Sequence, residues 1–297
     1  MKKTVFLSFC FFVCIISPKA QSNDANMSAQ IHNLVGVVDS AQYGIAFKDL
    51  KTGKSFFINE HGSFHAASTM KVPVMVAAFD QIRRRTFSLQ DSIVVHDHFK
   101  SIADGSDYSL SPKEDSDTAI YKMLGQKMSV YEVIFRMVTM SSNLATNMMV
   151  EKVGAENVMK TMWKLGVKDM QVLRGVENGK AYAKGLNNTT TAYDLMLVME
   201  AIANGKAVSK KASQAMKDIL LQQQYNEEIP QLLHKDVKVA HKTGWITGIR
   251  HDAGIVYLPD GRKYVLVLLS RFPPGKDAQN LEVTQKMSRV FYDAVVQ

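Results

Sequence analysis

The chain has 297 residues, of which 46% are hydrophobic and 22% are charged, and its formal net charge is +8 at pH 7. A chain of this length can bury a full hydrophobic core without disulfide bonds or a structural metal. It contains no long run of lysine and arginine and no stretch of interleaved basic and aromatic residues, so we expect no nucleic-acid partner.

The first twenty residues have the layout of a secretory signal peptide. Lys2 and Lys3 form a basic start, residues 4–17 are an apolar run too short for a typical membrane span, and Ala20 is a small residue at the predicted cut. We therefore expect secretion across the inner membrane to the periplasm or the extracellular space, without stable membrane insertion. A short uncleaved anchor is the alternative, but no stop-transfer pattern follows the run.

Both cysteines of the chain, Cys10 and Cys14, lie inside this segment. The mature chain therefore has no thiol, and we expect no disulfide, no cysteine-bound metal and no cofactor. Removing residues 1–20 takes away three lysines and no acid, which lowers the net charge from +8 to +5. This mild basicity suits an anionic substrate.

Apolar spacing predicts strands near both ends of the mature chain and helices between them. The first two strands form a hairpin through residues 49–53, and Pro259-Asp260-Gly261 forms a turn between the last two. In chain order we expect a helix at 25–38, strands at 43–48 and 54–59, helices at 70–82, 130–138, 144–153 and 193–203, strands at 237–242, 253–258 and 264–270, and a helix at 278–296.

This order implies that the two ends of the chain meet in one sheet, in a mixed fold of the α/β (α+β) type. We expect a single domain over residues 21–297, with a sheet lobe from residues 21–66 and 205–297. Residues 67–204 would form a mostly helical lobe beside it. A groove between two lobes is a common place for a small-molecule site.

Ser68 and Lys71 are two polar residues in an otherwise apolar stretch, AASTMKVPVM. On a helix they would lie on one face, with the serine near the start, where unpaired N–H groups favour negative charge. A serine becomes a good nucleophile when a neighbouring base takes its proton, and a lysine can be that base if burial or nearby positive charge lowers its pKa. A capping serine beside a surface lysine is the alternative, and the pair alone does not decide between them.

Two further segments carry polar residues at the ends of predicted elements. Ser141-Ser142-Asn143 lies between two helices, where a serine could cap a helix or relay a proton towards Ser68. Lys242-Thr243-Gly244 ends a predicted strand, where Gly244 allows close backbone approach to a ligand and the lysine and hydroxyl could hold a carboxylate. The next N–H, on Trp245, could form an oxyanion hole with that of Ser68.

The order and spacing of these three segments resemble those of class A β-lactamases, a branch of the penicillin-recognising serine hydrolases. Ser-x-x-Lys comes first, Ser-x-Asn follows about seventy residues later, and Lys-Thr-Gly about a hundred residues after that. The Thr189-Thr190-Thr191 helix start also resembles that branch. The resemblance implies a five-stranded antiparallel sheet flanked by helices, beside the helical lobe.

The resemblance also implies roles in an acylation reaction. Ser68 would be the acylated nucleophile and Lys71 its general base. Ser141 would pass the proton to the leaving nitrogen, and Asn143 would hydrogen-bond Lys71 and the substrate.

The third segment would bind the substrate. Lys242 and Thr243 would engage its carboxylate beside Gly244, and the Ser68 and Trp245 amides would hold the oxyanion.

The chain departs from the family pattern in two places. Ser142 stands where the family usually has aspartate in Ser-Asp-Asn. In the omega loop, the family has a glutamate followed four residues later by an asparagine, which together position the deacylating water. The nearest match is Glu177, whose +4 neighbour is Ala181, so Glu177 is either the deacylating base or a solvated carboxylate paired with Arg174.

The histidines suggest weaker sites. His96-Asp97-His98 resembles the start of a metal-ligand cluster, but no further ligand spacing completes it, so we expect surface or capping histidines. His65, His241 and His251 flank the motifs, and we expect structural hydrogen bonds there, with His251-Asp252 a candidate to orient the site.

The sequence therefore predicts a monomeric serine β-lactamase that opens β-lactam rings through an acyl-enzyme on Ser68. Two alternatives share the chemistry up to acylation. One is a serine hydrolase acting on D-alanyl peptides of peptidoglycan, and the other is a sensor that is acylated by β-lactams and deacylates poorly. The fate of the acyl-enzyme separates them, and it depends on Glu177.

Overall fold

The computed structural model describes residues 18–297, so the predicted signal peptide lies almost wholly outside the described residues. Its predicted cut after Ala20 falls inside the first helix, α1 (Pro18–Val35). No helix within residues 18–297 combines the length and the apolar character that crossing a bilayer requires.

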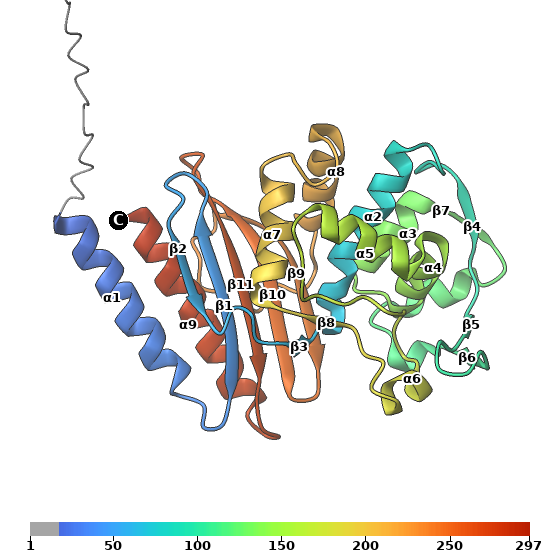
Figure 1. Cartoon of the computed structure of the whole chain (residues 1–297), viewed down its shortest axis with the longest axis horizontal. Coiled ribbons are helices and arrows are strands. Elements are labelled where there is room, and N and C mark those ends of the chain that lie inside the picture. Colours follow the sequence, from blue (N-terminus) through green and yellow to red (C-terminus); the bar gives the residue numbers. More distant parts are fainter. Residues whose placement is uncertain (1–17) are drawn as a thin grey trace, which may run out of the picture.

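One five-stranded antiparallel sheet organises the molecule, in the order β2-β1-β11-β10-β9 (Figure 1). As predicted, the two ends of the chain meet in it, because the first strand pairs with the last. The strands are β1 (Gln42–Asp49), β2 (Ser55–Ile58), β9 (Lys238–Ile246), β10 (Ile249–Tyr257) and β11 (Lys263–Arg271).

The expected end of β9 at residue 242 is wrong, because the strand continues through the Lys-Thr-Gly segment to Ile246. Ile246 pairs directly with Ile249, and Gly248 adopts a positive φ of 74° in the two-residue turn between them. The glycine there lets a tight hairpin form, so both strands are longer than their apolar cores.

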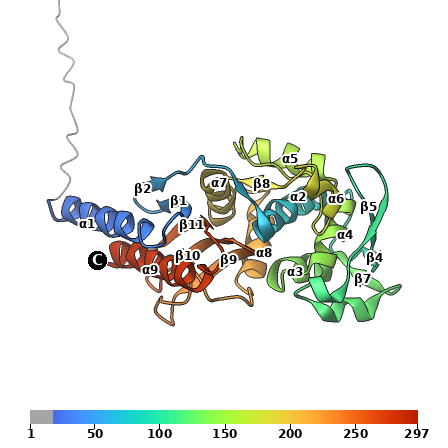
Figure 2. The ribbon, with the colours of Figure 1, turned by 90° about the horizontal axis from the view of Figure 1, so that it is seen from below.

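Helices cover both faces of the sheet (Figures 1 and 2). α1 and α9 (Asp277–Val296) pack together on one face, where Phe47 of β1 stacks on Phe291 at 4.9 Å between ring centroids. α7 (Ala192–Ala203) packs on β1 and β11 on the other face, and α8 (Lys210–Leu220) packs on β9. Apolar spacing predicted α1, α7 and α9, whose apolar residues are buried against the two faces of the sheet. It did not predict α8.

The remaining helices form the side of the molecule opposite α1 and α9 (Figure 1). Met70 and Val74–Ala78 are buried there at the centre of the larger core. The helices are α2 (Lys71–Arg83), α3 (Val130–Thr139), α4 (Asn143–Val153), α5 (Ala155–Lys164) and α6 (Gly179–Ala183), with 3-10 turns η1 (Ala67–Met70), η2 (Pro112–Glu114) and η3 (Thr118–Met123).

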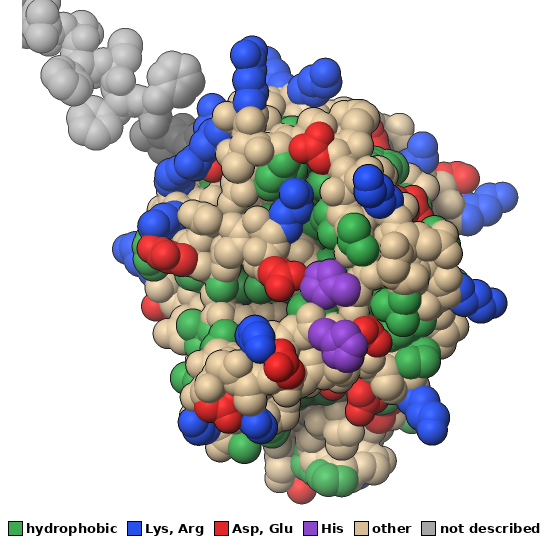
Figure 3. Space-filling view, turned by 90° about the vertical axis from the view of Figure 1, so that its right-hand side faces the viewer, with side chains coloured by type: hydrophobic (Ala, Val, Ile, Leu, Met, Phe, Trp, Pro, Cys, Tyr) green, Lys and Arg blue, Asp and Glu red, His purple; other side chains and the backbone are tan. Residues whose placement is uncertain are grey.

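Short two-stranded ladders complete this side. They pair β3 (Phe64–His65) with β8 (Thr189–Thr190), β4 (Ser92–Val94) with β7 (Lys127–Ser129), and β5 (His98–Lys100) with β6 (Asp107–Ser109). The outer face of this side carries charged side chains of both signs, spread without one dominant patch (Figure 3).

Candidate active site

Ser68 lies in the η1 turn, directly before α2 begins at Lys71. The turn packs against β9, which is the edge strand of the sheet. Gly244 makes this contact possible, because a Cβ atom there would lie 3.1 Å from the backbone nitrogens of Ser68 and Thr69. The close approach expected at Gly244 is therefore with the Ser68 backbone itself.

Lys71 is fully buried, with 0% of its surface exposed. Its Nζ donates to the Ser141 carbonyl at 2.8 Å, to Ser141 Oγ at 3.2 Å and to Asn143 Oδ1 at 3.0 Å. A surface lysine beside a capping serine is thus excluded. Within residues 18–297, no hydrogen bond joins the Ser68 hydroxyl to Lys71 or Ser141.

Lys242 is the second fully buried amine of the site. Its Nζ donates to Ser141 Oγ at 3.1 Å and to the Thr243 carbonyl at 2.9 Å. The Ser141 hydroxyl therefore contacts two buried lysines, one from α2 and one from β9. Because both Nζ atoms contact the same oxygen, the two amines lie close together.

Burial of these amines penalises their charged forms. It lowers the pKa of Lys71 to about 7, although the carboxylates of Asp115 and Glu177 oppose the shift. Burial, together with the positive charge of Lys71, also lowers the pKa of Lys242 well below its ordinary value. The pair therefore favours a state in which one amine is neutral and can accept a proton.

In the Ser141-Ser142-Asn143 segment, Ser142 caps a helix and Ser141 contacts the buried lysines. Ser142 is the N-cap of α4 and its hydroxyl accepts from the Ala145 N–H at 3.2 Å. Ser141 has a positive φ of 55°, an uncommon conformation that lies directly at its contact with the two lysines. The capping reading therefore holds for Ser142, while Ser141 contacts the two buried lysines.

Asp115 places a carboxylate at the start of α4. The family pattern has its aspartate in the same region, at the position that Ser142 occupies in this chain. Its oxygens accept from the backbone N–H of Asn143 at 2.9 Å and of Leu144 at 2.8 Å. A carboxylate here satisfies unpaired N–H groups and complements the helix dipole. Asp115 is not predicted from the sequence, because its contact with α4 depends on the path of the chain.

Glu177 joins the site through Asn143. Asn143 Nδ2 donates to Glu177 Oε1 at 3.1 Å, while its Oδ1 accepts from Lys71, so one amide connects the two ionisable groups. Burial raises the pKa of Glu177, and the negative charge of the nearby Glu114 raises it further. Glu177 also has a positive φ of 55°.

The alternative of an ion pair between Arg174 and Glu177 does not form. Arg174 is buried and its guanidinium donates to the carbonyls of Leu186 at 2.7 Å and Gly175 at 2.9 Å, and to Asn187 Oδ1 at 3.0 Å. It therefore holds the loop together through neutral groups, and the reading of Glu177 as a solvated carboxylate paired with Arg174 is wrong.

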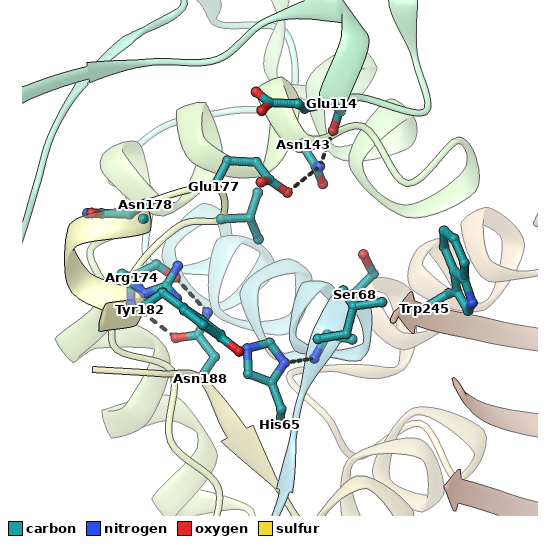
Figure 4. Close-up of a pocket in the computed structure, with 14 residues that line it drawn as sticks. His65, Ser68, Glu114, Asn143, Arg174, Glu177, Asn178, Tyr182, Asn188 and Trp245 are labelled. Atoms are coloured by element: carbon teal, nitrogen blue, oxygen red, sulfur yellow. Dashed lines mark hydrogen bonds between the residues drawn. The ribbon is translucent and has the colours of Figure 1, made fainter. Parts of the chain in front are cut away.

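A cavity of about 430 Å³ lies over the Ser68 side chain (Figure 4). In Figure 4, Asn143 and Glu177 lie above Ser68, Trp245 lies to its right, and Tyr182 and His65 lie to its left and lower left. Lys71 and Lys242 are fully buried and do not line the cavity. The cavity is lined by His65, Ala67, Ser68, Glu114, Asn143, Arg174, Val176, Glu177, Asn178, Gly179, Tyr182, Asn188, Trp245 and Ile246.

The histidines near the motifs make structural contacts. His241 Nδ1 lies 2.9 Å from Asp252 Oδ1 on the neighbouring strand, and both side chains are fully buried. His251 Nε2 lies 2.9 Å from the His65 carbonyl, and burial lowers the pKa of His251 to about 4. Asp252 therefore pairs with His241 rather than with His251, and these contacts fix β9, β10 and β3 around the site.

The His96-Asp97-His98 segment does not assemble a metal site within residues 18–297. His96 Nε2 lies 3.0 Å from Glu151, and His98 Nδ1 lies 2.6 Å from Ser109 Oγ. Both histidines are therefore surface residues with local partners.

We predict that Asp115→Ala lowers the free energy of unfolding by about 2 kcal/mol, because it leaves two buried N–H groups of α4 without their acceptor. Chemical denaturation would measure the change. Asp107→Ala is the control, since Asp107 pairs with Lys100 at the surface and should cost less than about 0.5 kcal/mol. Equal losses for the two variants would contradict the capping role of Asp115.

Comparisons with known proteins agree with this architecture. A sequence model described as the β-lactamase enzyme family matches residues 26–295. A β-lactamase of Bacteroides uniformis is 25% identical over 312 residues, covering 99% of this chain and 100% of the relative. The solved structure of PBP-A is 28% identical with a TM-score of 0.78, covering 91% of this chain and 96% of that one.

Two further solved structures are similar. A mutant of PBP-A, solved as its acyl-enzyme complex with penicillin G, is 29% identical with a TM-score of 0.78, covering 91% and 96% of the two chains. A β-lactamase from Chitinophaga pinensis has a TM-score of 0.80 at 24% identity, covering 91% and 99%, which supports the fold alone. Since the family match spans nearly the whole chain, the protein belongs to the β-lactamase enzyme family.

Proposed function

We propose that the protein is a serine β-lactamase, which hydrolyses the β-lactam amide through an acyl-enzyme on Ser68. The observation that carries the proposal is the Ser141 hydroxyl, held between the buried amines of Lys71 and Lys242. Burial lowers the pKa of both amines, and the cavity gives a substrate access to Ser68.

Acylation would begin when Lys71, in its neutral form, takes the proton of the Ser68 hydroxyl. Ser68 Oγ then forms a bond to the lactam carbonyl carbon, and the resulting oxyanion lies at the Ser68 and Trp245 amides. Ser141 delivers a proton to the lactam nitrogen as the C–N bond breaks, and its contact with Lys71 lets that proton be replaced from the lysine.

The substrate carboxylate would be held by Lys242 and the Thr243 hydroxyl, beside Gly244. Lys242 is desolvated, and a carboxylate would favour its charged form. Asn143 would hydrogen-bond the substrate amide as well as Lys71, because its side chain lines the cavity.

Deacylation would use Glu177 as the general base. It would take a proton from a water molecule that attacks the Ser68 ester, and the ester C–O bond would break to return the serine hydroxyl. The contact between Asn143 and Glu177 supports this role, since it ties the carboxylate to the group that also holds Lys71.

A second candidate function is an acylated protein that deacylates slowly, as a D-alanyl peptidase or a β-lactam sensor would. The feature that favours it is the loop itself, because Ala181 stands four residues after Glu177, where the family pattern has asparagine. The similar PBP-A mutant, solved as a penicillin acyl-enzyme, adds support.

We also propose that residues 1–20 are removed as a signal peptide and that residues 21–297 act as one monomeric catalytic domain. The mature enzyme would be class A-like, act in the periplasm or the extracellular space, and contribute to antibiotic resistance there. In this division residues 67–204 form the helical lobe, and residues 21–66 and 205–297 form the sheet lobe.

With a chromogenic cephalosporin, we expect many turnovers per molecule of wild-type protein and none with Ser68→Ala. A single stoichiometric burst with a lasting adduct would support the second candidate function instead. Neither turnover nor an adduct with the wild-type protein, or turnover or an adduct that persists with Ser68→Ala, would contradict both.

For Glu177→Gln we expect acylation at a near-normal rate but turnover reduced about 100-fold or more, because the base for the water is lost. The acyl-enzyme should then accumulate and be visible by intact mass. Glu114→Gln is the matched control, since it changes another carboxylate of the same cavity wall and should leave turnover near normal. Unchanged turnover in Glu177→Gln would remove Glu177 from this role.

A further inference from the structure

The cavity over Ser68 is not the place where the substrate carboxylate would bind. Ser68, Asn143 and Trp245 line it. Lys242 and Thr243, the described residues assigned to the carboxylate, do not. A substrate whose carbonyl lies at Ser68 and whose carboxylate lies at Lys242 and Thr243 would therefore enter the cavity with its other end. That end is the acyl side chain beyond the amide that Asn143 would bind.

Tyr182 presents an aromatic ring to this cavity. It lines the wall and is nevertheless 59% exposed. In Figure 4 it extends from α6 towards His65, and the centroids of the two rings lie 6.2 Å apart with their planes at 63°. An aromatic ring left open in a concave wall beside the nucleophile offers a surface that a second ring can cover.

Both rings belong to segments that are held in place without a substrate. His65 Nδ1 accepts from the Ala67 N–H at 3.1 Å, which fixes the imidazole to the turn that carries the nucleophile. The Tyr182 N–H donates to the Asn178 carbonyl at 2.9 Å, and the buried Asn178 side chain accepts from Ser101 Oγ at 3.0 Å. The five-residue helix α6 is thereby anchored to a neighbouring segment, so the Tyr182 ring needs little further ordering when a ligand binds.

The surroundings of Tyr182 leave room for an uncharged ring. Burial lowers the pKa of His65, and the positive charge of Arg174 lowers it further, so the imidazole is neutral at pH 7. Gly179 lines the same cavity three residues before Tyr182, and a Cβ atom there would meet no atom of the described chain within 4 Å. The space beside the Tyr182 ring is therefore open to a planar apolar group.

We infer that Tyr182 is a specificity-determining residue of the proposed hydrolysis, because its ring stacks on an aromatic ring in the acyl side chain of the substrate. The inference rests on the proposed function and names its substrate class, which is β-lactams with an aromatic acyl side chain. Stacked rings gain free energy beyond the burial of their area. Tyr182 would therefore favour these substrates over lactams that carry an aliphatic side chain of similar size.

Two penicillins that differ only in the side chain test the inference, one with a phenylacetyl group and one with an octanoyl group, which have the same number of carbon atoms. The measurement is the ratio of their kcat/KM values, or of their second-order acylation constants if the acyl-enzyme lasts. We expect a ratio of about 10 for the wild type and about 2 or less for Tyr182→Leu. A ratio does not depend on the fraction of active protein, so a poorly folded variant cannot imitate the effect.

Two further variants separate the ring from other effects of the substitution. Tyr182→Phe keeps the ring and should retain the ratio of the wild type. Tyr131→Leu is the matched control, since Tyr131 is a tyrosine of α3 that is 42% exposed but does not line the cavity. It should also leave the ratio unchanged.

Gly179→Leu tests the same space without altering Tyr182. Leucine is a better helix former than glycine, so α6 should not be weakened, while the new side chain would occupy the space beside the ring. We expect the kcat/KM of the phenylacetyl compound, relative to that of 6-aminopenicillanic acid, which has no acyl side chain, to fall about fivefold or more.

The outcomes distinguish this inference from the proposed function. Reaction of both penicillins with a wild-type ratio near 1 would overturn the inference and leave the hydrolase function standing. So would a ratio that Tyr182→Leu leaves unchanged, or one that Tyr131→Leu lowers as much. No reaction of either penicillin at Ser68 would overturn the proposed function, and this inference with it.

Discussion

The proposed chemistry of this protein depends on one hydroxyl group held between two buried amines. Ser141 Oγ lies 3.2 Å from Lys71 and 3.1 Å from Lys242, and neither lysine is exposed to water. If both amines were charged, two cations would share one hydroxyl with little solvent to screen them. A neutral Lys71 relieves this, because the hydroxyl can then accept from one lysine and donate to the other.

The fold supplies this arrangement from three segments that are far apart in the sequence. Lys71 comes from the start of α2, Ser141 from the residue two before α4, and Lys242 from the edge strand of the sheet. Two local features bring them into contact: Gly244 lets β9 approach the Ser68 backbone, and Asp115 secures the start of α4. A small error in either would misplace the hydroxyl that the two amines share.

Local patterns in the sequence predicted most of the fold, since the strands and α2, α3, α4, α7 and α9 contain the apolar residues that the core buries. The predicted end of β9 at residue 242 failed because the segment that follows is polar, and a two-residue turn at Gly248 continues the hairpin there. The contacts of Asp115 with α4, of Arg174 with Leu186 and of His241 with Asp252 were not predictable. Each joins residues at least eleven positions apart that only the folded chain brings together.

The most direct test of this account is the titration of Lys71, followed by NMR in protein with ¹³C-labelled lysine and assigned by the loss of one signal in Lys71→Arg. Because burial depresses its pKa, Lys71 should be neutral above pH 7 and become protonated as the pH falls through about 7. The acylation rate should fall over the same interval, because protonation removes the base. A midpoint near the ~10.4 of an exposed lysine, with acylation unchanged between pH 9 and pH 6, would contradict the account.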